Sequence, residues 1–140
     1  MDLAECFRNG LIRKATIDKS LISSLIEMAD IKEITVKKAK IDKQNISAYV
    51  SLSYDSLREV LEAICISRGY KVLSHVCIGK LLKNLLNDFD YNGFDRLRYT
   101  RNSVNYYGIK VGFNQGREII NIIFIMKKKL LEKYLAKFRE

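Results

Sequence analysis

The residue types best suited to chemistry lie in one stretch of the chain, from Asp95 to Gly108. If this stretch is helical, steps of three and four residues place five polar side chains on one face: Arg98, Arg101, Asn102, Asn105 and Tyr106. That face holds two guanidinium groups, two amides and a phenol, with no carboxylate to neutralise them. Guanidinium groups bind phosphate oxygens through paired hydrogen bonds, so the face predicts a site for phosphate or a nucleic acid backbone. The alternative is a solvated helix face whose arginines pair with acids elsewhere, such as Asp88, Asp90 or Asp95.

The same stretch also resembles a known family. Arg101-Asn102 followed by Tyr106-Tyr107-Gly108 at a helix end resembles the signature helix of the HEPN superfamily of small all-α proteins. Upstream, Tyr54 and Arg58 on a long helix, then residues 66–71 and Ser74-His75, are similar to the second helix and following turn of archaeal and bacterial members. The resemblance covers roughly residues 15 to 138.

The resemblance implies a fold, partners and a chemistry. It implies an HEPN-like bundle of four to five helices that forms a homodimer, with the signature helices facing a shared cleft. Many members are metal-independent ribonucleases, and some are toxins of toxin–antitoxin systems whose partner is a minimal nucleotidyltransferase. Arg101 matches the motif arginine and Asn102 the motif polar residue, but the motif histidine position falls on Tyr106.

Tyrosine at this position changes the expected activity. Cleavage of RNA by its own 2′-hydroxyl needs a group that moves protons near neutral pH. An ordinary tyrosine titrates near ~10, whereas histidine titrates near ~6.5. The favoured prediction is therefore a non-catalytic protein that binds nucleic acid or a nucleotide at a dimer cleft lined by Arg98, Arg101, Asn102, Asn105 and Tyr106. The alternatives are a metal-independent ribonuclease, in which Arg101, Asn102 and Tyr106 would be catalytic, and an interaction module for a minimal nucleotidyltransferase.

The other candidate residues each allow a simpler interpretation. His75, the only histidine, follows a predicted helix cap and is expected at the surface, although it could approach the Arg101 helix and replace the missing base. Cys65 and Cys77 are expected in the core, and with a single histidine no metal site or cofactor is predicted. Lysines 127–129 are expected on a solvated helix face, with a second nucleic acid contact or an acidic partner as the alternative. A helix-turn-helix with Arg96, Arg98 and Arg101 on its recognition helix is disfavoured, because residues 87–93 form too long a turn.

The helices that must position these residues follow from the apolar spacing. We expect helices from Asp18 to about residue 29 or 37, from about 43 to 68, from Ser74 to about 86, from 94 to 107 and from about 117 almost to the end. Loops are expected at 87–93 and 112–116, and residues 1–15 are expected to form a peripheral leading segment with a short helix. The first two turns of the last helix are apolar all round, which predicts burial on several sides and favours a homodimer; the residues are Ile119, Ile120, Ile122, Ile123, Phe124, Ile125 and Met126.

Composition bounds the remaining possibilities. The chain has 140 residues, 25 Lys and Arg against 16 Asp and Glu, a net charge of +9 and no proline. This is one domain, 1–140, and the absence of proline favours long helices. We therefore predict an all-α, up-and-down antiparallel helical bundle. Three cysteines without a Cys-x-x-Cys pair exclude a disulfide scaffold and a zinc ribbon. The acidic start and the short apolar runs predict no signal peptide, no membrane association and a cytoplasmic location.

Overall fold

The computed structural model describes residues 1–139 and is a helical bundle with one small sheet. The expected all-α bundle is confirmed. In chain order the elements are α1 (Leu3–Arg8), β1 (Ile12–Lys14), α2 (Lys19–Lys38), α3 (Ile46–Ser67), β2 (Tyr70–Val72), α4 (His75–Leu85), α5 (Tyr91–Tyr107), α6 (Phe113–Tyr134) and the 3₁₀ helix η1 (Ala136–Phe138). Among the described residues, no helix is long and apolar enough to cross a membrane.

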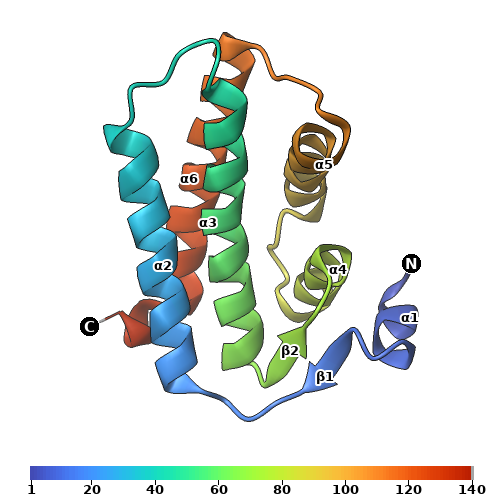
Figure 1. Ribbon diagram of the computed structural model, residues 1–140. Coiled ribbons are helices and arrows are strands. Elements are labelled where there is room, and N and C mark those ends of the chain that lie inside the picture. The colour runs from blue at the N-terminus through green and yellow to red at the C-terminus, as the bar shows by residue number, and fades with distance from the viewer. Residues whose placement is uncertain (140) are drawn as a thin grey trace.

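Helix α3 lies at the centre of the molecule and packs against α2, α4, α5 and α6 (Figure 1). Its side chains Tyr54, Leu57, Leu61 and Ile64 are fully buried. Helix α2 runs antiparallel to α3, whereas α6 runs in the same direction as α3 (Figure 1). The intervening helices α4 and α5 are seen nearly end-on and carry the chain back to the start of α3. This crossing places α5 beside α3.

Most helix ends lie where local sequence signals predict them. Asp18 caps α2 by accepting a hydrogen bond from the backbone of Leu21, and Ser74 caps α4 at the backbone of Cys77. Gly69 and Gly108 follow α3 and α5 with φ of 85° and 63°, a conformation that a residue with a Cβ rarely adopts. The β-branched stretch from Ile31 to Lys37 continues α2 rather than breaking it.

The structure differs from the sequence prediction at two helix starts. Helix α5 begins at Tyr91, inside the predicted 87–93 loop, because the Asp90 side chain caps it. Helix α6 begins at Phe113, so the predicted 112–116 turn is wrong. Gly116 is buried in the first turns of α6 and packs against Ile46 of α3. Its missing side chain lets the two helices approach closely.

Two expectations for α6 are corrected by its packing. Ile123 and Phe124 are buried, but Ile122 and Ile125 are 45% and 52% exposed, so the apolar run is not buried all round in the single chain. Lys127, expected on a solvated face, is fully buried. Its ammonium group donates to Glu33 Oε1 at 2.6 Å, Asp30 Oδ1 at 3.0 Å and the Ala29 carbonyl at 3.3 Å.

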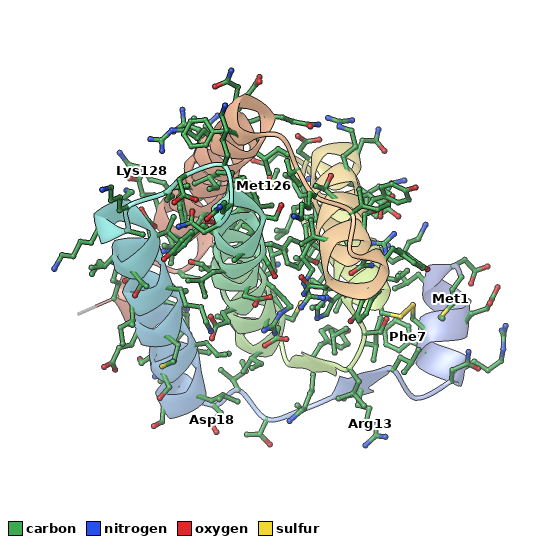
Figure 2. All side chains as sticks on the ribbon, turned by 45° about the horizontal axis from the view of Figure 1, so that its top comes forward. Met1, Phe7, Arg13, Asp18, Met126 and Lys128 are labelled. Atoms are coloured by element: carbon green, nitrogen blue, oxygen red, sulfur yellow. A yellow bond between two sulfur atoms is a disulfide. The ribbon has the colours of Figure 1, made fainter. Side chains whose placement is uncertain are left out.

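The N-terminal segment is joined to the bundle by two contacts that the sequence analysis did not predict. Strands β1 and β2 pair antiparallel, with Ile12 opposite Val72. Cys6 of α1 and Cys77 of α4 form a disulfide bond, drawn as a yellow bond near Met1 and Phe7 in Figure 2. Cys65 is buried and free, as expected. Disulfides are rare in cytosolic proteins, so this bond does not support the cytoplasmic location expected from the sequence, which remains a prediction.

Candidate functional site

Helix α5 is fixed at both ends and along its buried face, which determines where its arginines reach. The Asp90 carboxylate accepts a hydrogen bond from the Gly93 N–H at 2.9 Å, and Gly108 ends the helix in the left-handed conformation. Phe94 and Leu97 are buried. Phe94 also stacks on Tyr54 of α3, with ring centroids 6.0 Å apart. These contacts hold α5 so that Arg101 reaches α3.

Arg101 lies between two aromatic rings and beside a carboxylate. Its Nη2 donates to Asp55 Oδ1 at 3.3 Å. Its guanidinium carbon is 5.5 Å from the Tyr54 ring centroid and 5.9 Å from that of Tyr106, within the range of cation–π attraction. The side chain is only 13% exposed, so Arg101 is positioned rather than freely solvated.

Helix α3 supplies a second guanidinium group to the same place. Arg58 lies four residues after Tyr54 and therefore on the same helix face. Its Nη1 donates to Glu62 Oε1 at 2.6 Å, and its Nε lies 4.0 Å from Asp55 Oδ1. Two arginines from different helices thus approach one carboxylate oxygen.

His75 reaches this group from the start of α4. Its ring centroid is 5.9 Å from that of Tyr54, and the side chain is partly buried. Burial, together with the positive charges of Arg58 and Arg101, lowers the pKa of His75 to about 4. The imidazole is therefore neutral at neutral pH. The sequence left open whether His75 lies at the surface or near the helix of Arg101. In the structure it is partly buried and lies near Arg101.

We call Tyr54, Asp55, Arg58, His75 and Arg101 the arginine cluster. Burial raises the pKa of the Tyr54 phenol, and the charges of Arg101 and Arg98 only partly oppose this. Tyr54 is therefore protonated at neutral pH and is available as a hydrogen-bond donor. The cluster combines donors from three helices, and its two arginines approach the Asp55 carboxylate.

Three donors in the arginine cluster are buried without a partner. They are the hydroxyl of Tyr54 and the Nε atoms of Arg58 and Arg101, and no other buried side-chain nitrogen or oxygen in residues 1–139 lacks a partner. A buried donor left unpaired costs about 1–3 kcal/mol, and more when it is charged. Such groups are uncommon in native proteins and call for an explanation. Acceptor oxygens, such as those of a phosphate group, are the partners that such donors bind.

The other predicted site residues lie around the arginine cluster with different exposure. Arg98 donates to Asp95 Oδ1, with Nη2 at 2.9 Å, which is one of the acid partners that the alternative interpretation named. Asn105 accepts from the Ser51 hydroxyl at 2.9 Å. Asn102 is partly buried, whereas Tyr106 is 69% exposed and lies over Arg101.

The predicted polar face of α5 needs one correction. Arg98 and Arg101 both have carboxylate partners, because Asp95 lies one turn away and Asp55 comes from α3. Tyr107 is the last residue of α5 and is 77% exposed.

Comparison with known proteins gives no match: no family model, no curated protein and no solved structure matches this chain. The function must therefore be inferred from the geometry of the site.

Sequence reasoning did not assign Asp55 a role and quoted Tyr54 and Arg58 only for a family resemblance. The available signal was the run of polar residues Tyr54, Asp55, Arg58 and Glu62 at three- and four-residue steps along one face of a helix. A cavity of about 340 Å³ adjoins the arginine cluster, with His75 and Glu62 in its wall. No sequence pattern indicated this cavity, because α2, α3, β2 and α4 all line it.

Proposed function

We propose that this protein binds the phosphate groups of a nucleic acid or nucleotide at the arginine cluster. The proposal rests on one observation: the buried, unpartnered donors belong to neighbouring residues, since Arg101 lies over the Tyr54 ring and both Arg58 and Arg101 approach Asp55. Phosphate oxygens are strong acceptors and suit arginine geometry. Asn102, Asn105 and exposed Tyr106 would extend the site, with the amides bonding to a base or sugar and the phenol ring stacking on a base.

Asp55 defines how such a ligand must bind. Its Oδ1 already lies 3.3 Å from Arg101 Nη2 and 4.0 Å from Arg58 Nε. The carboxylate therefore stands where a phosphate oxygen would make the same contacts. A phosphate must compete with Asp55 for the two arginines, which lowers its affinity for the site.

A second candidate function is metal-independent RNA cleavage. It is favoured by the position of His75 beside Tyr54, because a neutral imidazole can accept a proton. A histidine with a pKa of about 4 is a weak base at neutral pH, and for this reason binding remains the first proposal. Membership of the HEPN superfamily, which the sequence resembles, is likewise a proposal.

The test is an assay of labelled RNA with EDTA that scores retention and cleavage separately. Arg101→Ala and Arg58→Ala are expected to weaken retention by about tenfold or more, because each removes a charged hydrogen-bond donor worth roughly 1.5–3 kcal/mol. Arg96→Ala is the matched control, since Arg96 is exposed on the same helix. Retention should also fall steeply with salt.

The possible outcomes separate the candidates. Cleavage that disappears in Arg101→Ala and in His75→Gln would support the ribonuclease. Equal retention by Arg101→Ala and Arg96→Ala would reject the arginine cluster as the binding site. If the protein neither retains nor cleaves RNA or nucleotides, the polar face of α5 would instead fit an interaction module, with a minimal nucleotidyltransferase as the partner to test.

A further inference from the structure

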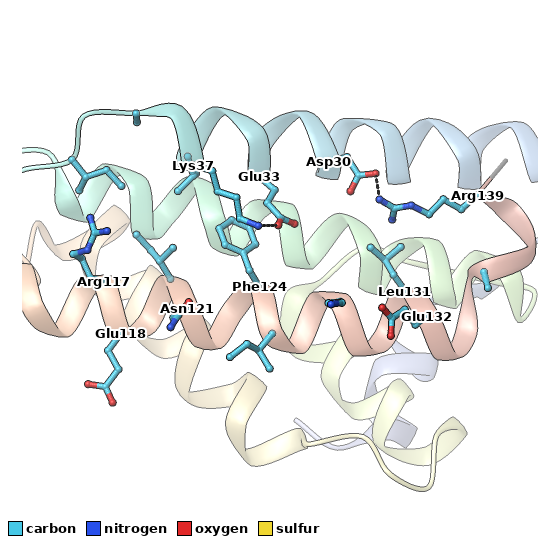
Figure 3. Close-up of a pocket in the computed structure, with 17 residues that line it drawn as sticks. Asp30, Glu33, Lys37, Arg117, Glu118, Asn121, Phe124, Leu131, Glu132 and Arg139 are labelled. Atoms are coloured by element: carbon cyan, nitrogen blue, oxygen red, sulfur yellow. Dashed lines mark ion pairs between the residues drawn. The ribbon is translucent and has the colours of Figure 1, made fainter.

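A groove of about 1140 Å³ lies between α2 and α6, away from the arginine cluster (Figure 3). None of the residues in the arginine cluster lines it. Its lining includes equal numbers of acidic and basic residues, so the groove is locally neutral in a chain of net charge +9. Along one edge runs α6, with Glu118, Asn121 and Glu132 labelled in Figure 3.

The edge formed by α6 carries an exposed stripe with helical spacing. Glu118, Asn121, Ile125 and Lys128 follow one another at steps of three or four residues, and Ile122 lies beside them. All five are exposed, including the two isoleucines noted above. Two large apolar side chains in the middle of a solvated helix face indicate a contact surface.

The charged ends of this stripe have no partners within residues 1–139. Neither Glu118 nor Lys128 forms an ion pair, whereas Glu33 and Asp30 on the groove wall are both paired with the buried Lys127. Between Glu118 and Lys128 the stripe is therefore acidic at one end, apolar in the middle and basic at the other end, and the exposed Glu132 follows one turn beyond Lys128. When a second copy of the stripe lies antiparallel to the first, the acidic end of each copy faces the basic end of the other.

We propose that this stripe binds the same stripe of a second copy, with the two α6 helices antiparallel about a twofold axis. A twofold contact requires a self-complementary surface, and the stripe has this property. Glu118 of each copy would lie opposite Lys128 of the second copy, and Ile125 opposite Asn121. The repeat of three and four residues is that of antiparallel helix pairs.

The register that pairs these charges also gives the longest contact. Glu118 lies about as far from the start of α6 at Phe113 as Lys128 lies from its end at Tyr134. Pairing them aligns the two helices over nearly their full length, about 33 Å for 22 residues. Side chains of the second copy would partly fill the groove beside α6.

Charge also favours a second copy at this face over other faces. The rest of the surface carries the excess positive charge, so most contacts between two copies would repel. The groove and stripe are balanced. This dimer does not depend on the proposed function, because no residue of the arginine cluster takes part.

Charge reversal tests the proposal. Wild-type protein is expected to dimerise reversibly in sedimentation equilibrium. Glu118→Lys or Lys128→Glu alone should weaken the dimer by about tenfold or more, because each places like charges opposite each other twice. Glu27→Lys is the matched control, since Glu27 is exposed on α2 outside the groove.

The decisive measurement is a mixture of the two single variants. Glu118→Lys chains carry two lysines on the stripe and Lys128→Glu chains carry two glutamates, so the mixture should form a heterodimer about as stable as the wild-type dimer. The double variant in one chain should recover the homodimer. Circular dichroism confirms that each variant is folded. A monomeric wild type, or a dimer that neither reversal weakens, would overturn the proposal, as would a mixture that fails to associate.

Discussion

At the scale of single residues, Asp55 and His75 control the electrostatics of the arginine cluster. Asp55 faces Arg58 and Arg101 from within the cluster, and His75 is held neutral by burial and by those same arginines. Asp55 therefore competes with an anionic ligand for the arginines, and His75 makes the stability of the folded state depend on pH.

Replacing Asp55 by asparagine should strengthen phosphate binding. The substitution removes the carboxylate that competes for Arg58 and Arg101 but keeps its size, so the affinity for inorganic phosphate or a short RNA should rise by about tenfold. Isothermal titration measures this, with Glu27→Gln as a control that changes the net charge equally at a distant exposed position. Equal gains in both variants would mean that only the overall charge matters.

His75 should make folding stability fall as the pH decreases. An unfolded histidine binds a proton near pH ~6.5, whereas folded His75 does so only near pH 4. Between these values the unfolded state binds more protons, so acid favours unfolding, by about 1 kcal/mol at pH 5 for this partly exposed group. Urea unfolding at pH 7 and pH 5 measures the loss. The same loss in His75→Gln would show that other groups cause it.

At the scale of elements, the position of α6 depends on one small residue packed against α3 and one buried charge paired with α2. A Cβ at Gly116 would clash with Ile46 Cγ1 and lie 3.4 Å from Val50. Lys127 joins α6 to α2 through Asp30 and Glu33. Although burial acts to raise the pKa of Glu33, its hydrogen bonds with Lys127 and Lys37 lower it overall. The packing of α6 thus depends on contacts with both neighbouring helices.

Gly116→Ala should destabilise the protein despite the better helix propensity of alanine. Ile46 is fully buried and must shift to admit the new methyl group, which costs about 1–3 kcal/mol. Gly112→Ala provides the control, because a Cβ there meets nothing within 4 Å. Urea midpoints for the two variants should differ clearly. Stability of Gly116→Ala equal to that of the control would contradict the close packing of α3 and α6.

At the scale of the whole molecule, the disulfide and the two-stranded sheet join the first 14 residues to the rest. Cys6 and Cys77 are 71 residues apart in the chain, and the pairing of β1 with β2 lies beside their bond. A covalent link across so long a separation restricts the unfolded chain strongly. The leading segment is therefore part of the bundle rather than an appendage.

Breaking the disulfide should lower the stability of the entire chain. The double variant Cys6→Ala with Cys77→Ala is expected to lose about 2–5 kcal/mol in free energy of unfolding. Reductant should lower the wild type to the level of the variant and leave the variant unchanged. Urea unfolding with and without reductant checks this. A wild type that is insensitive to reductant and as stable as the variant would contradict the link.

The sequence by itself determined those features that depend on neighbours within about four residues. Asp18, Ser74 and Gly108 end or begin their helices through local hydrogen bonds or backbone conformation, so helix type and most boundaries were predictable. Arg98, Arg101 and Tyr106 were placed on one helix face for the same reason.

Only the tertiary structure decided which residues far apart in the chain meet. Lys127 is buried because Asp30, 97 residues earlier, lies beside it, and Arg101 gains its partner Asp55 from another helix. Burial and charge pairing depend on how whole helices pack, and the local pattern of a single helix does not contain that information.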